Sequence, residues 1–402
     1  MNVNNGRKID YWFGIPLCFL LSIPGYVLKI LRIKPKSGKA PEKIAFIKLS
    51  ELGAIVLAYP FLTRIKNDHP LAEISFVTFE RNKGIFKLLG NIVEDNNIFT
   101  IRETTPTTFF LDTFKVIWQL RSKGIDVIFD LEFFSRFSTI ISYLSGAKKR
   151  VGLHHYTFEG LYRGSLLTHK IQYNPLSHVS KTYLSFTQVI SAPSKEHPQL
   201  DSAIIEGELA FPEYASKVKI KESIEKRLKD VGIGSKRRIF LFNPGEGVLP
   251  LREWPLENFI SLSNLVLQDS ANQILIVGTE GATKKSGLMR GAITSSRCVD
   301  FTGKTSLEEL MELFLISEAL ISNDCGLVHL AMLTGIKKFI LFGPESPQVF
   351  GPKDENSHII YSNWPCSPCL SVLNHRESSC TDNKCLKIIK PEAVYKTILE
   401  SL

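Results

Sequence analysis

The stretch EALISNDCGLVHLAMLTG, Glu318–Gly335, contains one complete strand-to-helix unit. An apolar run ends at Asn323-Asp324, and a helical pattern begins at Gly326, where a glycine permits a tight backbone turn. Short β-branched or aromatic runs alternate with helical stretches in the same way from Lys43 onward. Strands that alternate with helices of about ten to fifteen residues predict a parallel, doubly wound α/β sheet.

Two series of such units follow one another along the chain. The strands expected in the first half are 43–50, 74–79, 97–101, 126–131 and 149–153, and those in the second half are 237–243, 274–278, 298–303, 318–324 and 337–343. We therefore expect two Rossmann-like domains, over residues 41–205 and 236–390, that face each other across a cleft. The remaining parts are a hydrophobic and basic segment (1–40), a charged, mostly helical linker (206–235) and a C-terminal helix (391–402).

Composition agrees with a globular protein of two or three folding units. The chain has 402 residues, of which 44% are hydrophobic and 22% charged. Its formal net charge of +9 favours anionic partners, namely nucleic acid, acidic phospholipid or a phosphorylated substrate. Nucleic acid is the weakest of these partners, because the basic residues are scattered and no RNA-binding aromatic signature is present.

Near the N-terminus, Tyr11–Leu28 is an uncharged and mostly apolar run, YWFGIPLCFLLSIPGYVL. It just reaches the length of a membrane-spanning helix, but Pro16 and Pro24 disfavour one continuous helix. The alternatives are a broken helix that lies in the lipid headgroup layer and a helical hairpin buried on the protein. Basic residues on both sides, including Arg7 and Lys8, favour association with an anionic membrane surface. The heavier positive charge after the run places the main body in the cytoplasm.

The loop at Asn323–Gly326 is suited to a phosphorylated ligand. The free amides and the positive end of the following helix favour a pyrophosphate group. Asp324 is better suited to the hydroxyl groups of a sugar or ribose, or else to capping the helix. His329 lies one turn into the helix, where it either faces the ligand or packs in the core.

Three further loops follow expected strands. NPGEGVLPLREWP (Asn243–Pro255) offers exposed amides, and its Arg252 either neutralises a phosphate or is an ordinary surface arginine. LSELGA (Leu49–Ala54) permits close approach of a ligand at its glycine and carries a carboxylate. GTEG (Gly278–Gly281) has a glutamate that suits a ribose. Together, the four loops predict a ligand site at the carboxyl ends of the strands.

These segments resemble glycosyltransferase family 9, the lipopolysaccharide heptosyltransferase-like enzymes, from Lys43 to the C-terminus. The resemblance is carried by KIAFIKLSELG, NPG…REWP, FTGKTSLEEL (Phe301–Leu310), SNDCGLVHLAMLTG and FGPESP (Phe342–Pro347). It implies the GT-B fold, with a nucleotide-sugar donor on the C-terminal domain and an acceptor on the N-terminal domain. It also implies transfer with inversion and no catalytic metal or other required cofactor.

The resemblance also assigns roles to particular residues. Asp324, Cys325 and Gly326 would contact the sugar and phosphates of the donor, Arg252 would stabilise the leaving diphosphate, and Thr305 would line the base pocket. Ser50 and Gly53 belong to the acceptor loop. From the loops and the resemblance together, the expected donor-binding set is Asn243, Gly245, Arg252, Glu280, Thr305, Asp324, Cys325, Gly326 and His329.

One position departs from the family pattern. The first loop usually carries an aspartate directly after its glycine, as general base for the acceptor hydroxyl, and this chain has Ala54 there. Loss of a positioned base typically lowers the rate by about 10²–10⁴-fold. Either the chain is an active transferase in which Glu51 or another group accepts the proton, or it is an impaired protein that binds a nucleotide sugar or a partner enzyme.

The expected reaction follows from the resemblance. A sugar, with heptose as the family's default, would pass from ADP-heptose or a similar donor to lipopolysaccharide or another cell-envelope glycan. The acceptor would be a lipid-linked or phosphorylated saccharide at the cytoplasmic face of the bacterial inner membrane. A dinucleotide-dependent oxidoreductase is disfavoured, because no GxGxxG follows any expected strand.

Four of the seven cysteines lie close together near the C-terminus. Cys366, Cys369, Cys380 and Cys385 have the spacing C-x₂-C-x₁₀-C-x₄-C. Four thiolates can complete a tetrahedral zinc site. The alternatives are free or paired thiols, although disulfides are rare in cytoplasmic enzymes. We therefore expect a structural role here, with zinc as the candidate ion.

Overall fold

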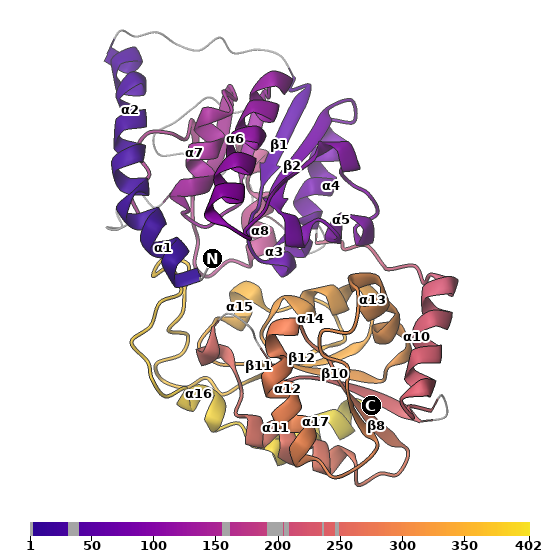
Figure 1. The fold of residues 1–402 in the computed structure, drawn as a ribbon. Coiled ribbons are helices and arrows are strands. Elements are labelled where there is room, and N and C mark those ends of the chain that lie inside the picture. The colour runs from indigo at the N-terminus through magenta and orange to yellow at the C-terminus, as the bar shows by residue number, and fades with distance from the viewer. Residues whose placement is uncertain are drawn as a thin grey trace. The chain divides into compact units, whose positions relative to one another are not determined.

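The computed structural model describes residues 3–30, 40–154, 161–190, 204, 209–234, 237–245 and 249–402. The chain divides into two compact units, Met1–Ala210 and Phe211–Leu402 (Figure 1). Each unit is an α/β domain with one sheet of six strands, and each is described separately below.

The N-terminal unit contains a wholly parallel sheet with the strand order β3-β2-β1-β4-β5-β6. Its strands are β1 Lys43–Ile47, β2 Glu73–Phe79, β3 Ile98–Ile101, β4 Val127–Asp130, β5 Lys149–His154 and β6 His169–Gln172. Its helices after β1 are α3 Leu52–Leu57, α4 Tyr59–Asp68, α5 Ile85–Leu88, α6 Pro106–Lys123, α7 Arg136–Leu144, α8 Val179–Leu184 and α9 Thr187–Ile190. Buried phenylalanines, including Phe46, Phe61 and Phe129, pack against one another beside the central strands.

The C-terminal unit repeats this plan, with the strand order β12-β11-β10-β7-β8-β9 and only parallel pairs. Its strands are β7 Arg238–Asn243, β8 Asn272–Ile276, β9 Cys298–Asp300, β10 Ala319–Asn323, β11 Lys337–Phe342 and β12 Ser357–Tyr361. Its helices are α10 Val218–Asp230, α11 Leu256–Val266, α12 Thr283–Ala292, α13 Leu307–Ile316, α14 Gly326–Ala331, α15 Pro347–Phe350, α16 Lys384–Lys387 and α17 Pro391–Ser401. If the strands of each unit are numbered from one to six in chain order, both sheets have the strand order 3-2-1-4-5-6.

The doubly wound α/β fold predicted from the sequence is therefore confirmed in both units. All ten expected strands form, and each sheet has one more strand at its edge, β6 or β12. Neither edge strand shows the buried apolar pattern of the central strands: β6 is the four-residue HKIQ, and no residue of β12 is fully buried. The helix expected between residues 206 and 235 is α10, which packs on α13 of the C-terminal unit.

The apolar N-terminal run forms parts of two helices, α1 Val3–Trp12 and α2 Gly14–Ile30, with a turn at Phe13 between them. Within the described part of the chain, no helix combines the length and the apolar character needed to cross a bilayer. Both helices pack on α7. The carboxylate of Asp10 in α1 accepts a hydrogen bond from the Phe137 amide at 2.8 Å, at the first turn of α7.

Candidate functional site

In the C-terminal sheet, the order in which successive strands are added reverses between β7 and β10. These two strands pair with each other although two strands lie between them in sequence. Loops leave such neighbouring strands toward opposite faces of the sheet, and the resulting crevice at the carboxyl ends is where open α/β sheets bind ligands. The loops predicted to hold the phosphorylated ligand start here, after Asn243 and Asn323.

Side-chain hydrogen bonds from Asn323 fix these two loops to each other. Its amide nitrogen donates to the Pro244 carbonyl at 3.0 Å, and its side-chain oxygen accepts from the Trp254 backbone amide at 2.8 Å. The indole of Trp254 is fully buried and donates to the Ile389 carbonyl at 3.0 Å. The segment that carries Arg252 is thus anchored at its beginning and at its end.

Arg252 lies against Asp324, as the sequence-based hypothesis requires. Its guanidinium Nε donates to the Asp324 backbone carbonyl at 3.1 Å, and Nη2 lies 3.2 Å from the Asp324 carboxylate. A second carboxylate, that of Glu345 after β11, lies 3.8 Å from Nη1. The Arg252 side chain is only 11% exposed, so its charge faces the strand ends and not bulk solvent.

The carboxylates around Arg252 are deeply buried. Burial raises the pKa of the Asp324 carboxyl, although the positive charge of Arg252 opposes that rise. Glu345 is 1% exposed and also lies 3.5 Å from Nε of Arg376, which comes from the loop after β12. Two arginines and two acids thus form one cluster, of which the sequence had predicted only Arg252 and Asp324. We name Arg252, Asp324, Glu345 and Arg376 the charged cluster.

Three other predicted residues pack beside this cluster. The Asn243 side chain donates to Ser322 Oγ at 3.1 Å and to Cys325 Sγ at 3.2 Å, which joins the ends of β7 and β10. At Gly245 there is no room for a side chain, because a Cβ atom would lie 2.8 Å from the Cβ of Ala282. These residues shape the loops and hold them close together.

The remaining predicted residues of this unit lie at or near the same sheet edge. Glu280 follows β8 and is exposed, and Thr305 follows β9 and is half-buried. Gly326 is exposed at the start of α14, but its φ is not positive, so the expected turn does not depend on a glycine there. The residue that caps α14 is Cys325 and not Asp324, and His329 is buried within the helix.

In the N-terminal sheet, the strand order reverses between β1 and β4. There the Glu132 carboxylate accepts hydrogen bonds from Lys48 Nζ at 2.8 Å and from the Leu49 and Ser50 amides at 2.7 and 3.0 Å. Lys48 is 1% exposed. Glu132, which the sequence analysis did not single out, therefore fixes the predicted acceptor loop.

The predicted acceptor loop brings an exposed carboxylate to the sheet edge. Glu51 is exposed and has a φ of 65°, a conformation that is uncommon for a residue other than glycine. Gly53 and Ala54 follow it inside α3, and both are buried. Outliers of this kind gather at functional loops. Ala54 is the position at which the family resemblance led us to expect an acid, and Glu51 lies three residues before it.

A second buried acid lies two residues before Glu132. Asp130, the last residue of β4, accepts hydrogen bonds from Thr139 Oγ1 at 2.9 Å and from the Glu132 amide at 3.2 Å. Burial raises its pKa to about 6, with Arg163 opposing the rise. The Arg163 side chain is itself buried and donates to the Leu153 carbonyl.

Comparison with known proteins places the chain in a family. The profile of glycosyltransferase family 9 (heptosyltransferase) matches residues 113–379. The chain belongs to glycosyltransferase family 9. Among its relatives, lipooligosaccharide heptosyltransferase 2 of Haemophilus influenzae is 29% identical over 145 residues, which are 35% of this chain and 41% of the relative. The match thus spans about two fifths of that relative's length.

Solved structures of other glycosyltransferases share the fold. The family 9 glycosyltransferase of Veillonella parvula has a TM-score of 0.70 and 17% identity, over 91% of this chain and 100% of the other. The ADP-heptose lipopolysaccharide heptosyltransferase II of Escherichia coli has a TM-score of 0.65 and 19% identity, over 89% and 97%. At these identities the likeness establishes the two-domain α/β fold of this family 9 protein.

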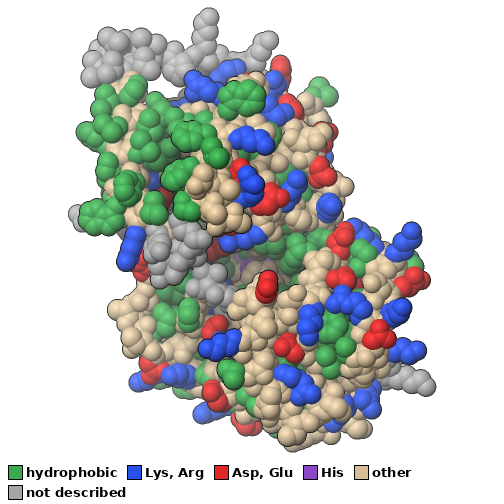
Figure 2. Space-filling model, in the orientation of Figure 1, with side chains coloured by type: hydrophobic (Ala, Val, Ile, Leu, Met, Phe, Trp, Pro, Cys, Tyr) green, Lys and Arg blue, Asp and Glu red, His purple; other side chains and the backbone are tan. Residues whose placement is uncertain are grey.

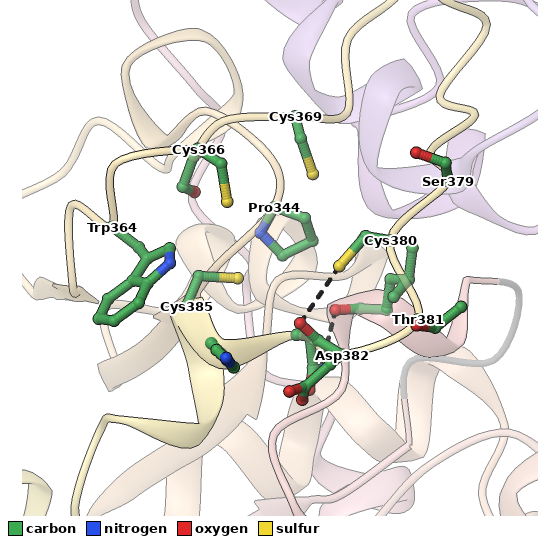
Figure 3. Close-up of a pocket in the computed structure, with 13 residues that line it drawn as sticks. Pro344, Trp364, Cys366, Cys369, Ser379, Cys380, Thr381, Asp382 and Cys385 are labelled. Atoms are coloured by element: carbon green, nitrogen blue, oxygen red, sulfur yellow. Dashed lines mark hydrogen bonds between the residues drawn. The ribbon is translucent and has the colours of Figure 1, made fainter.

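The four clustered cysteines of this family 9 chain line one pocket of about 330 Å³ in the C-terminal unit. Figure 3 shows their sulfur atoms directed toward the space around Pro344. All four thiols are free. In the described ranges, no three or more His, Cys, Asp or Glu side chains are arranged to hold a metal ion. The four cysteines therefore line a common pocket, but in this structure they do not form the four-thiolate site that their spacing allows.

Proposed function

We propose that the protein is an inverting glycosyltransferase. It would move a sugar, a heptose in the first instance, from ADP-heptose or a similar nucleotide sugar to lipopolysaccharide or another cell-envelope glycan. Membership of family 9 supports this class of reaction. The observation that carries the proposal is the contact of Arg252 with Asp324 at the change of strand order in the C-terminal sheet.

Negative charge develops on the leaving diphosphate as its bond to the sugar breaks. A guanidinium that is already fixed in place stabilises that charge without reorganising during the reaction. Arg252 meets this requirement, because the Asp324 carbonyl and two carboxylates hold it in one orientation. Asp324 would accept hydrogen bonds from sugar hydroxyls. The exposed Glu280 and half-buried Thr305 would serve the nucleoside end of the donor.

Inversion is a single displacement, so a group on the acceptor side must take the proton of the attacking hydroxyl. We assign this role to Glu51, which is exposed at the end of the acceptor loop. Glu132 is less suited, because its carboxylate already accepts hydrogen bonds from Lys48, Leu49 and Ser50. The Ala54 methyl favours the alternative function, a nucleotide-sugar-binding or partner protein without efficient turnover.

The acceptor in this proposal is a lipid-linked or phosphorylated saccharide at the cytoplasmic face of the bacterial inner membrane. The N-terminal helices support it, because side chains of α1, α2 and the turn between them stay apolar and exposed although the helices are docked on α7. Trp12, Phe13 and Phe19 are 71%, 72% and 57% exposed. Transfer itself would need no metal, and we assign to the four cysteines one structural zinc ion, around which their thiolates would close.

A transfer assay with purified full-length protein tests this function. We expect release of ADP from ADP-heptose that depends on an added lipopolysaccharide-core acceptor, and a product of inverted anomeric configuration by NMR. A donor that binds but yields no product, with any acceptor of the panel, would favour the binding protein. Failure of every nucleotide sugar to bind would reject both the transferase and the nucleotide-sugar-binding protein, and would leave only the partner protein.

A further inference from the structure

Helix α6 presents an apolar stripe to solvent. Its inward face is buried through residues that include Thr113, Val116 and Leu120. Its outward face carries large apolar residues at helical spacing, where a helix on the surface of a globular protein is normally polar. These residues and their exposed fractions are Phe110 58%, Leu111 62%, Phe114 67% and Trp118 68%.

The helices α1 and α2 have the same inverted character. Their inward contacts are specific and partly polar: Ser22 Oγ accepts from the Ser165 amide at 2.8 Å, and Cys18 is fully buried against Ile140 and Leu166. Their outward residues are large and apolar. These residues and the turn residue between the helices are Trp12 71%, Phe13 72%, Leu17 42%, Phe19 57%, Leu20 58% and Ile23 45% exposed.

The two apolar regions lie on one side of the N-terminal unit. Both α2 and α6 pack on α7, which lies between them (Figure 1). In Figure 2, apolar side chains gather over this face of the unit. Monomeric soluble proteins rarely expose contiguous apolar patches larger than a few hundred Å², and larger patches mark interaction sites. We name α1, α2 and the stripe of α6 the apolar face.

The charges on these helices indicate what the apolar face binds. Among the described residues of the three helices, the only acidic side chains are Asp10 and Asp112, and each is bound to an arginine. The exposed charged side chains are basic, for example Lys8, Lys115 and Arg121. An apolar face with tryptophans and a basic surround fits the headgroup layer of an anionic bilayer.

We propose that α6 and α1–α2 form a single membrane-docking surface, which lies in the headgroup layer of an anionic bilayer. The bilayer would contact the unit on both sides of α7, at α1–α2 and at α6. Contacts at two separate places would hold the N-terminal unit in one orientation and not merely tether it. This inference deepens the proposed function and rests on it for the lipid-linked acceptor. The docking surface itself is tested without any sugar transfer.

The experiment measures binding of the full-length protein to vesicles of phosphatidylglycerol and phosphatidylethanolamine by co-sedimentation. We expect the double variant Phe114→Ser/Trp118→Ser to bind at least tenfold more weakly than the wild type, and Phe19→Ser/Leu20→Ser to do the same. The matched control is Leu71→Ser, because Leu71 is 96% exposed and lies outside the three helices. It should bind as the wild type does. Phosphatidylcholine vesicles should bind every protein weakly.

Unchanged vesicle binding by Phe114→Ser/Trp118→Ser would overturn the proposal. So would a wild-type dimer that this variant dissociates and that does not bind vesicles, because the apolar face would then be an interface between two copies. Stabilisation by ADP, measured on the same proteins, reports folding and donor binding separately. Weak vesicle binding by Phe114→Ser/Trp118→Ser with normal ADP stabilisation supports the docking surface. A wild type that binds vesicles but is not stabilised by ADP counts against the transferase only.

Discussion

At the level of single residues, the account depends most on Arg252. Its guanidinium is 11% exposed and is held by the carbonyl of one acid and the carboxylates of two. Sequence reasoning predicted that Arg252 and Asp324 share a site, because both follow strands whose carboxyl ends meet at one edge. It did not predict Glu345 or Arg376, because loops carry no periodic pattern that reveals which distant side chains they approach.

Replacement of Arg252 by alanine should lower kcat by about 10²–10³-fold, the usual effect of losing one preorganised group that stabilises transition-state charge. Steady-state transfer kinetics measure this effect. Because the change also leaves the buried Asp324 carboxylate without its cation and Glu345 with Arg376 alone, circular dichroism must first show that the variant folds. Arg252→Lys, which keeps the charge but not the planar fork, should lose less activity. Wild-type kinetics for a folded Arg252→Ala would exclude the assigned role.

The base is tested by two exchanges in the acceptor loop. If Glu51 accepts the proton, Glu51→Gln should lower kcat by about 10²–10⁴-fold. Ala54→Asp should then change turnover by less than about tenfold, because a base is already present. The same transfer assay measures both variants. If Ala54→Asp instead raised kcat a hundredfold and Glu51→Gln left kcat unchanged, the wild type would be the impaired protein.

Asp130 should make the stability of the N-terminal unit depend on pH. Its pKa rises from 3.8 to about 6 on folding, so the folded state favours the protonated acid. This stabilisation is complete below about pH 4 and is lost as the pH rises through 6. As the pH rises from 4 to 7, the free energy of unfolding of Asp130→Asn should therefore increase relative to that of the wild type, by up to about 3 kcal/mol. Urea unfolding at several pH values measures the difference, and a constant difference would contradict the assignment.

At the level of elements, all strands but two were predictable, and the two that were missed, β6 and β12, each form one edge of a sheet. Strands such as β1 and β10 are buried along almost their whole length, and most of their residues are apolar. The edge strands β6 and β12 mix polar and apolar residues, because fewer neighbours cover them. Turn chemistry was predictable only in part. The turn into α14 was expected to need Gly326, but the structure makes it with Cys325 in an extended conformation.

The long loop after β12 leads to a testable prediction about the cysteines. Residues 362–383 contain no helix or strand, yet they include three of the four clustered cysteines and Arg376 of the charged cluster. Loops longer than about 12–15 residues without secondary structure are uncommon in compact domains. A zinc ion that joins Cys366, Cys369, Cys380 and Cys385 would tie this loop to α16, which contains the fourth cysteine.

Metal analysis of purified protein should accordingly find about one zinc ion per chain, the stoichiometry of a four-cysteine structural site. Cys366 is the exposed member of the first cysteine pair. Its replacement by serine should lower both the zinc content and the thermal stability. Less than about a tenth of a mole of zinc per chain would reject the ion and leave four free thiols around the pocket.

At the level of the whole molecule, the same topology occurs twice, and each copy places charged residues where its strand order reverses. The sequence predicted the repetition, because both halves alternate strands and helices with similar spacing. It also predicted which loops lie at the carboxyl ends. It left the N-terminal run open between a buried hairpin and a membrane element. The structure shows helices that are docked on α7 and apolar on the outside.

The central claim is that the C-terminal unit binds the diphosphate of a nucleotide sugar at the charged cluster. Thermal unfolding of the full-length protein against a panel of nucleotide sugars tests this claim most directly. We predict that one donor, ADP-heptose first, adds about 2.7 kcal/mol of stability at a hundred times its Kd, and that Arg252→Lys needs at least tenfold more of it. A panel in which no nucleotide sugar stabilises the wild type would contradict the account, as would a donor that stabilises both proteins equally.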